Sequence, residues 1–548
     1  MPTRTLRGLT TPIILLALAT LAGCAGLSGQ HPHEAAQTSS ASTTAATAAT
    51  AAEPAPVEAT SADSSIVWQD IAIPQATPAP NLWTRIRRGF RLPDGNEARV
   101  QTEVRWYRSH PAYMKRTARR AKPYLYFVVQ QAKQRGVPTE LALLPIVESA
   151  YDPFAYSNGR AAGLWQFIPS TGRHFDLSQN WWYDGRRDVA ASTGAALSYL
   201  KALHDEFNGS WLLALAAYNS GAITVQRAIE RNRRRGRPTD FWHLDLPAQT
   251  RAYVPRLLAV RDIVQNPGEY GIDLPFIANA PYLARVNLDG QIDLAIAANM
   301  AGISLRQMYL LNPGYNRWAT PPDGHSTLFI PAADKGQFLA RLETMKKQVE
   351  VQWAAHRVRS GETLGTIARR HHTTVSELKR RNGLHGSMIR AGATLMVPSA
   401  SQHFTRYVLS QSMRTASTQN QSHGARKVRV RVQHGDTLWG LARLYHVSVA
   451  KIASWNGMAP RDPLHVGQKL VIWKKAGAQV ARHRGKRYPV SAVRRIHYVV
   501  HRGDSLSSIS DHFNVSLHKL AHWNSLSLSS VLHPGQRLTL FVDVRNQS

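Results

Sequence analysis

A single carboxylate, Glu148, stands where general acid–base chemistry is possible. The Pro-Thr-Glu run at 138–140 opens a predicted helix, because proline suits a first turn and glutamate favours its positive end. Pro145 predicts a kink or an early end of that helix, and the Asp-Pro pair at 152–153 stops any continuation. Glu148 is therefore expected at the end of a core-facing helix, where its carboxyl group can be half-buried and still reach a cleft.

Aromatic residues near Glu148 can supply an apolar environment for its carboxyl group. Burial against apolar walls raises the pKa of a carboxyl group, so that it stays protonated near neutral pH and can act as an acid. The candidate walls are Tyr151, Phe154, Trp165, Phe167 and Tyr218. These residue types predict an acid that protonates a leaving oxygen, as the cleavage of a glycosidic bond requires.

Three short motifs follow one another in the order Glu-Ser at 148–149, Gly-Leu-Trp-Gln at 163–166 and Ala-Tyr-Asn at 217–219. In this order they resemble the goose-lysozyme-type lytic transglycosylases, which cut bacterial peptidoglycan. The neighbouring residues narrow the resemblance to the membrane-bound lytic murein transglycosylase D group. One position departs from the common pattern, because Trp165 stands where many members have methionine. Both side chains are apolar, so we expect altered glycan contacts rather than lost chemistry.

The resemblance implies a mechanism with one carboxylate, whereas most glycosidases use two. In lytic transglycosylases one glutamic acid acts first as acid and then as base, and the 6-hydroxyl of the same N-acetylmuramic acid ring is the nucleophile. Ring closure is intramolecular, so proximity lowers the barrier. The product is a 1,6-anhydromuramyl end. Carried over to this sequence, the catalytic residue is Glu148, and the substrate-binding residues are Ser149, Gln166, Tyr218, Asn219 and Tyr253.

The substrate-binding residues have separate expected roles. Ser149 hydrogen-bonds the substrate or orients the acid, and Gln166 contacts the sugar. Asn219 donates to an acetamido group, Tyr218 forms a wall, and the hydroxyl of Tyr253 lies near the acid. Each also has a structural alternative, such as a helix-end serine, a buried amide, core packing or a turn cap.

Two other functions remain open. A hydrolysing muramidase of the same fold would need a second carboxylate facing Glu148, and Asp152, Asp176 and Asp184 are available. A non-catalytic wall-binding scaffold is the third hypothesis, although the intact motif around Glu148 speaks against it. The products separate the two enzymes, since a transglycosylase leaves anhydro ends and a muramidase leaves reducing ends.

The chain has 548 residues, which predicts several domains, and its formal net charge is +32. Such a basic chain should associate with polyanions or acidic surfaces. The charge is spread along linkers and small repeats, and the sequence has no zinc-finger spacing or RNA-binding signature, so we expect no nucleic acid partner. Histidines do not gather with Cys or Asp at ligand spacing, and no Gly-rich phosphate loop is present, so neither a metal nor another cofactor is expected.

The N-terminus predicts export and lipidation. Arg4 and Arg7 precede an apolar run at 11–22, which is typical of a signal peptide (1–23). The run ends in Leu-Ala-Gly before Cys24, the only cysteine, which indicates a bacterial lipoprotein box. Acyl chains on this residue would anchor the protein to a membrane. By resemblance to other lipoproteins, the alanine after Cys24 implies an outer membrane anchor facing the periplasm of a Gram-negative bacterium.

Residues 24–65 contain almost no large apolar side chains and predict a disordered tether. Folded protein is expected from near Trp68, and apolar residues at helical spacing over residues 66–267 predict a mainly α catalytic domain, which the resemblance makes lysozyme-like. The apolar segment from Trp211 to Tyr218 is expected to be a helix too short to span a membrane.

Three repeats follow at 355–398, 428–473 and 496–541. Each has a Gly-Asp/Glu-Thr/Ser-Leu opening, an asparagine after the second short helix (Asn382, Asn456, Asn524) and a closing Gly-x-x-Leu. They resemble LysM modules, a β-α-α-β fold that binds N-acetylglucosamine-containing glycans. The fold class is therefore multidomain, a helical catalytic domain followed by small β-α-α-β modules. Residues 280–332 are expected to form a degenerate LysM-like unit, and the linkers at 399–426 and 474–495 to be mobile.

Overall fold

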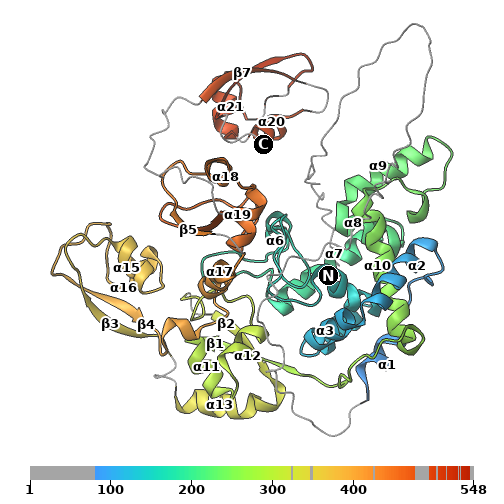
Figure 1. Ribbon diagram of the computed structural model, residues 1–548, viewed down its shortest axis with the longest axis horizontal. Helices are drawn as coiled ribbons and strands as arrows, with labels where there is room; N and C mark the ends of the chain where they lie inside the picture. Colours follow the sequence, from blue (N-terminus) through green and yellow to red (C-terminus); the bar gives the residue numbers. More distant parts are fainter. Residues whose placement is uncertain are drawn as a thin grey trace, which may run out of the picture. The chain divides into compact units, whose positions relative to one another are not determined.

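The computed structural model describes residues 80–322, 325–345, 350–423, 426–474, 493–500, 504–513, 515–528, 530 and 532–543. The chain divides into two compact units, residues 1–417 and 418–548, which are coloured from blue to orange and from orange to red in Figure 1. The predicted signal peptide, Cys24, the tether and the expected start near Trp68 lie outside the described residues. The multidomain fold class, helical first and then small antiparallel sheets, is confirmed.

The first part of unit 1 is helical and encloses one large apolar core. Its longest helices, α7 and α10, have 18 residues each, and both contact α8. The elements in chain order are α1 (Leu82–Arg87), α2 (Ala98–Ser109), α3 (Pro111–Ala121), α4 (Leu125–Gln134), η2 (Thr139–Leu143), α5 (Leu144–Ser149), α6 (Pro169–His174), α7 (Val189–Glu206), α8 (Trp211–Ser220), α9 (Ala222–Arg233), η3 (Phe241–His243), α10 (Ala248–Gln265) and η4 (Pro267–Tyr270).

Helix α8 carries the apolar segment that begins at Trp211. Ser210 caps its start by accepting a hydrogen bond from the N–H of Leu213. Ala214, Leu215, Ala216 and Ala217 are fully buried, so the helix is apolar because it lies inside the core. Within the residues that the structure describes, every helix falls short of the length and apolarity needed to cross a membrane.

The helix expected from residue 138 onward is two elements. A 3₁₀ helix, η2, runs from Thr139 to Leu143, and α5 starts at Leu144, with Pro145 in its first turn. Pro145 therefore opens the second helix, where its missing N–H costs nothing, rather than ending the first. Ala142 and Ile146 are buried as predicted. The break shortens α5, so the acid sits at the end of a helix of 6 residues.

The LysM-like unit follows the helical domain and begins with β1 (Leu283–Asp289). Helices α11 (Leu294–Met300) and α12 (Leu305–Leu311) lead to β2 (His325–Pro331), which pairs antiparallel with β1, and η5 (Ala332–Asp334) and α13 (Lys335–Thr344) are added at the end. Asn312 fastens α12 to the closing strand, since its side-chain amide donates to the carbonyl of Phe329 at 2.7 Å and its oxygen accepts from the N–H of Phe329 at 2.7 Å.

The segment expected as a mobile linker after residue 399 is folded instead. It contains η6 (Phe404–Arg406) and α17 (Gln411–Asn420), and Tyr407 and Leu409 belong to the apolar core of the LysM-like unit. The hydroxyl of Tyr407 donates to both carboxylate oxygens of Asp293, at 2.8 and 2.7 Å. The prediction of a mobile linker followed the mostly polar composition of the segment and gave too little weight to these two large apolar residues, which are buried in the core. In the linker 474–495, residues 475–492 lie outside the described part.

Each LysM module is a two-stranded antiparallel sheet with two helices, and each has its own small core. Their asparagines make the same contacts as Asn312. The side-chain amide of Asn456 donates to the carbonyl of Val471 at 2.7 Å, and its oxygen accepts from the N–H of Val471 at 2.7 Å. The modules comprise β3 (Gln352–Arg357), α15 (Leu364–Arg370), α16 (Val375–Arg381) and β4 (Thr394–Ser399); β5 (Arg426–Arg431), α18 (Leu438–Tyr445), α19 (Val449–Trp455) and β6 (Lys469–Lys474); and β7 (Val493–Val499), α20 (Leu506–His512), α21 (Leu517–Trp523) and β8 (Arg537–Asp543).

Candidate active site

Glu148 lies in the last turn of α5, as the sequence predicted. Its Oε1 accepts a hydrogen bond from the hydroxyl of Tyr253, which α10 carries. Tyr253 is 4% exposed, so its hydroxyl is held in place by the surrounding core. Helix α10 contacts both α5 and α8, and it therefore places Tyr253 next to Glu148, which comes much earlier in the chain.

The environment of Glu148 changes its acidity. Burial raises the pKa of the carboxyl group to about 7, against an ordinary value of 4.5, and the hydrogen bond from Tyr253 opposes that rise. The residue as a whole keeps some solvent contact, while its carboxyl group is closely surrounded by protein atoms. A carboxyl group with this pKa is protonated and ionised in similar amounts near neutral pH, so it can donate a proton and take one back.

The backbone after Glu148 is strained. Ala150 and Tyr151 have φ angles of 50° and 56°, a region that non-glycine residues rarely adopt. The hydroxyl of Tyr151 donates to the carbonyl of Ala142 at 2.7 Å, which fixes this turn against the core. Ser149 also points into the protein, because its hydroxyl donates to the carbonyls of Leu164 at 3.0 Å and Pro145 at 3.2 Å. The serine therefore ties the end of α5 to the next motif.

Gln166 lies in a tight loop with its backbone at φ 48°. Its side-chain amide donates to the carbonyl of Gly163 at 2.8 Å, so the hydrogen bond closes the loop on itself. Gly163 has φ +80°, and a Cβ there would lie 2.2 Å from the carbonyl oxygen of Arg186. The Gly-x-x-Gln spacing thus reflects a turn that requires glycine at its start.

Among the five aromatic residues predicted to line the site, Tyr218 is the one whose pKa is affected by the charge of Glu148. Burial, and then the charge of Glu148, raise its pKa well above the ordinary value. Its hydroxyl donates to the carbonyl of Trp165 at 2.8 Å. The indole N–H of Trp165 donates to the hydroxyl of Thr193 at 2.9 Å inside the core. Phe154 packs against the core of the LysM-like unit.

A threonine that the sequence reasoning missed orients Asn219. The hydroxyl of Thr250 donates to Oδ1 of Asn219 at 2.9 Å. Thr250 stands three positions before Tyr253 on α10, so the two residues face the same side of that helix. One helix therefore holds both the acid and the asparagine. The signal was the Thr-x-x-Tyr spacing, which is too common to single out without the contact.

The three candidate second carboxylates have other surroundings. Asp184 pairs with Arg186 at 2.8 Å and with Arg187 at 3.6 Å, whereas Asp176 is exposed. Asp152 accepts a hydrogen bond from the N–H of Phe154 at 2.9 Å. Within the described part of the chain, the pKa of Glu148 is shifted by burial and by the hydrogen bond from Tyr253, and by none of these aspartates. Across the same residues no group of three His, Cys, Asp or Glu side chains is placed to hold a metal.

Comparison with known families identifies the domains. The model described as "Transglycosylase SLT domain" matches residues 126–241, and the LysM domain model matches 356–398, 430–473 and 498–541. A third model, "Lytic transglycosylase MltD, LysM-like domain", matches residues 282–347. The unit expected to be degenerate is thus a LysM-like domain of a defined type, extended beyond β2 by α13.

Individual proteins resemble the chain to different extents. Membrane-bound lytic murein transglycosylase D from Escherichia coli (strain K12) is 35% identical over 428 residues, which cover 76% of this chain and 91% of that protein. An autolysin from Enterococcus faecalis is 32% identical over 182 residues, covering 33% of this chain and 24% of that protein. Among solved structures, an inactive mutant of lytic transglycosylase Slt from Pseudomonas aeruginosa is 22% identical, with a TM-score of 0.22, and covers 35% of this chain and 33% of that one.

The similarity to the E. coli protein extends over most of both chains, through the helical domain that holds Glu148 and into the modules that follow it. A shared short motif would not produce a match of this length. The chain is a lytic transglycosylase, and it belongs to the family of membrane-bound lytic murein transglycosylase D.

Proposed function

We propose that Glu148 cleaves the β-1,4 bond between N-acetylmuramic acid and N-acetylglucosamine in peptidoglycan, first as acid and then as base. The observation that carries this proposal is the opposition of two effects on one carboxyl group. Burial raises its pKa to about 7, which favours the acid, and the Tyr253 hydroxyl favours the carboxylate. Both protonation states are therefore accessible at one pH, as a residue with two successive roles requires.

The proposed reaction returns the enzyme to its starting state. Protonated Glu148 gives its proton to the oxygen of the leaving N-acetylglucosamine while the bond to C1 of the muramic acid ring breaks. The resulting carboxylate, stabilised by Tyr253, removes the proton from the 6-hydroxyl of the same ring. O6 then bonds to C1, the 1,6-anhydro ring closes, and the proton is back on Glu148. No water is consumed, and the intramolecular attack supplies the nucleophile by proximity.

The surroundings of Glu148 favour this mechanism over a hydrolysing muramidase. Asp184, a candidate second carboxylate, is neutralised by two guanidinium groups. Asp176 is exposed, and Asp152 accepts from the local backbone. Within the described residues, no aspartate is among the groups that shift the pKa of Glu148. A two-carboxylate mechanism needs a partner carboxylate at about 5–10 Å from the acid, and one at the near end of that range would raise the pKa of Glu148.

The remaining site residues take the following roles in the proposal. Asn219, with its oxygen held by Thr250, presents its amide N–H groups to an acetamido carbonyl. Gln166 presents its side-chain oxygen, since its amide nitrogen is used within the loop. Tyr218 forms the wall beside the acid. Ser149 orients the acid by holding the end of α5 through its hydrogen bond to the carbonyl of Leu164.

The modules and the N-terminus extend the proposal to the cell envelope. The LysM modules would bind N-acetylglucosamine-containing strands, and tethering raises the local substrate concentration at the catalytic domain. Lipid on Cys24 would anchor the chain to the outer membrane, facing the periplasm. The name of the E. coli relative, "membrane-bound", supports an anchor of this kind.

Mass spectrometry of products from purified peptidoglycan tests the catalytic proposal. The full-length chain is compared with Glu148→Gln and with Glu230→Gln, a matched change on the exposed face of α9. We expect wild type and Glu230→Gln to release muropeptides lighter by one water than hydrolytic ones, and Glu148→Gln to release none. Reducing-end products would establish a muramidase instead. Cleavage by Glu148→Gln at the wild-type rate, or no cleavage by any of the three proteins, would overturn the catalytic assignment.

A further inference from the structure

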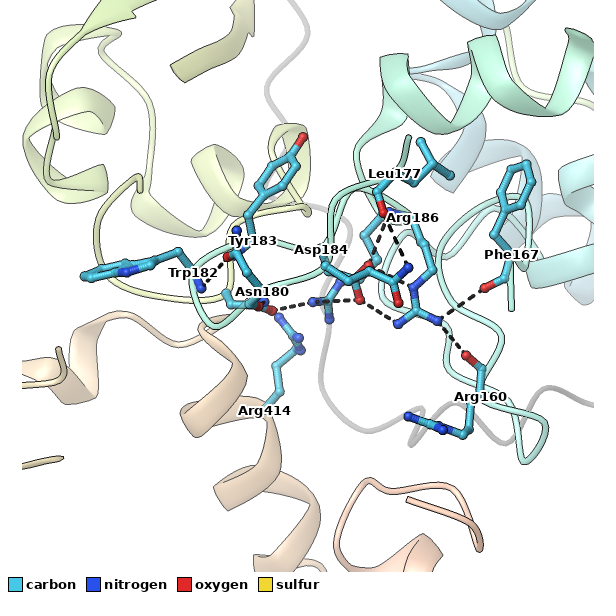
Figure 2. A network of polar contacts seen from close by, with 12 residues as sticks. Arg160, Phe167, Leu177, Asn180, Trp182, Tyr183, Asp184, Arg186 and Arg414 are labelled. Carbon is cyan, nitrogen blue, oxygen red and sulfur yellow. Dashed lines mark hydrogen bonds and ion pairs between the residues drawn. The ribbon is translucent and has the colours of Figure 1, made fainter. Parts of the chain in front are cut away.

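A loop of the catalytic domain, residues 177–187, is built into the LysM-like unit (Figure 2). The N–H of Asp184 donates to the carbonyl of Gly314 at 2.8 Å, and the N–H of Asn316 donates to the carbonyl of Trp182 at 2.8 Å. Trp182 is 6% exposed and belongs to the apolar core of the LysM-like unit. This loop therefore holds the two domains together by backbone pairing and by a shared core.

Within that loop, Asp184 pairs with two arginines. The guanidinium of Arg186 donates to both carboxylate oxygens, at 2.9 and 2.8 Å, while Arg187 lies 3.6 Å from the same carboxylate. Arg187 also donates to the side-chain oxygen of Asn316, on the LysM-like unit. Burial alone would raise the pKa of Asp184, but the two guanidinium groups more than offset it and hold the pKa below the ordinary value.

The same arginine reaches the loop that contains Gln166. One nitrogen of Arg186 donates to the carbonyl of Arg160 at 2.7 Å and to that of Phe167 at 3.3 Å, as Figure 2 shows. Its backbone oxygen fills the space where Gly163 lacks a side chain. Arg186 thus contacts the loop at Arg160, Gly163 and Phe167. Gln166 lies between the last two of these contacts.

Two further buried arginines, Arg317 and Arg414, lie near Arg187. Arg317 donates to the carbonyl of Trp181 at 2.9 Å, and burial followed by the charge of Arg187 lowers its pKa to about 10. Arg414, from α17, is more deeply buried, and burial lowers its pKa well below the ordinary value. Asp184 is a carboxylate that acts on both Arg187 and Arg414. Its loss would leave buried cations without that compensation, so the cluster is sensitive to single changes.

We propose that Arg186 is a positioning residue for glycan binding, and that the LysM-like unit braces the Gln166 loop through Asn316, Arg187, Asp184 and Arg186. The inference rests on the proposed function, since it takes the Gln166 loop as a substrate contact. It gives the LysM-like unit a role in the active site that differs from glycan capture. If the brace is weakened, the loop relaxes and the sugar is held less tightly, while the hydrogen bond from Tyr253 to Glu148, which α10 holds, remains.

Steady-state kinetics on soluble glycan strands that carry stem peptides test this, with the full-length chain. Arg186→Lys keeps the charge but cannot span two carbonyls and a carboxylate, so we expect KM to rise roughly tenfold or more while kcat falls less than threefold. Asn316→Leu should act in the same direction, and Asn316→Asp, which still accepts from Arg187, should restore KM. Arg285→Ala, an exposed change on the LysM-like unit, is the matched control and should leave both constants unchanged.

The outcomes separate a positioning role from a purely structural one. A variant that only unfolds part of the population lowers kcat in proportion to the folded fraction and leaves KM unchanged, and this result would overturn the inference. So would wild-type KM in both Arg186→Lys and Asn316→Leu. If Glu148→Gln is inactive and wild type yields anhydro ends while these KM values do not move, the positioning role alone fails. If the products are hydrolytic, the proposed function itself fails.

Discussion

The hydroxyl of Tyr253 donates a hydrogen bond to Oε1 of Glu148 across 105 residues of chain. This bond favours the ionised carboxylate, whereas burial favours the protonated acid. If Glu148 is the acid, as we propose, the position of the pH–rate profile depends on a balance between the burial of its carboxyl group and the hydrogen bond from one hydroxyl, and each can be changed separately.

Replacing Tyr253 by phenylalanine should move the alkaline limb of the pH–rate profile upward. The lost hydrogen bond no longer lowers the pKa of Glu148, so the acid stays protonated to a pH above about 7. The rate at the optimum should fall by roughly 10²-fold, because the carboxylate loses its stabilising donor. Product release measured from pH 5 to 9 checks this, with Tyr270→Phe as control. A limb that stays in place or moves downward would contradict the assigned role of the hydroxyl.

Glu148→Gln should stabilise the catalytic domain at high pH. The pKa of the folded state is about 7, above the ordinary value of 4.5, so ionisation penalises the folded state. The penalty is absent below the unfolded pKa, grows through the interval between the two values, and is complete above the folded one. The gain at pH 8 relative to pH 4 should reach up to roughly 3 kcal/mol. Thermal unfolding at both pH values measures it, and Glu230→Gln should show no such difference.

Thr250→Val should weaken substrate binding without moving the pH profile. The hydrogen bond of 2.9 Å to Asn219 is lost, so the amide that we assign to the acetamido group can rotate away. We expect KM to rise about fivefold to tenfold, which corresponds to about 1–1.4 kcal/mol. Thr250→Ser keeps the hydroxyl and should retain wild-type KM. An equal loss in both variants would show that packing, and not the hydroxyl, matters at this position.

Gly163→Ala should disrupt the Gln166 loop. The added Cβ would meet the backbone oxygen of Arg186 at 2.2 Å, at a φ of +80° that disfavours alanine in any case. Backbone atoms must move, so we expect a loss of more than about 2 kcal/mol of stability together with most of the activity. Gly159→Ala, in the same region, meets its nearest atom at 3.7 Å and should cost less than about 0.5 kcal/mol. Thermal unfolding and product release distinguish them.

Asn456→Ala should loosen the second LysM module alone. The side chain is 1% exposed and satisfies the N–H and the carbonyl of Val471 together with the carbonyl of Ile452. Leaving these groups unpaired should cost roughly 3 kcal/mol. Hydrogen exchange of β6 should accelerate while that of α4 stays unchanged. Asn382→Ala is the reciprocal control, and its effect should be confined to β4 of the first module.

Several features followed from local sequence patterns. The apolar spacing at Leu125 and Val128 predicted buried helix, and α4 has both residues in the core. The repeats were predicted from the Gly-Asp/Glu-Thr/Ser-Leu, asparagine and Gly-x-x-Leu pattern that recurs three times, and their β-α-α-β fold from the resemblance of that pattern to LysM modules. The break near Pro145 was expected as a kink or an early end of the helix, but the sequence pattern did not reveal that Pro145 starts a new element. The prediction of a mobile linker after residue 399 was wrong, because it followed the polar composition of the segment and not the apolar residues Tyr407 and Leu409.

The sequence by itself determined the helical class of the first domain, the repeats and the order of the motifs, since these depend on residues that are neighbours in the chain. Only the tertiary structure decided how the side chains meet. Tyr253 and Thr250 reach Glu148 and Asn219 across 105 and 31 residues, and Arg187 reaches Asn316 across 129. The inward direction of Ser149 and the insertion of Trp182 into another domain's core also depend on packing. Side-chain direction and long-range contact are set by the whole core, and no local pattern encodes them.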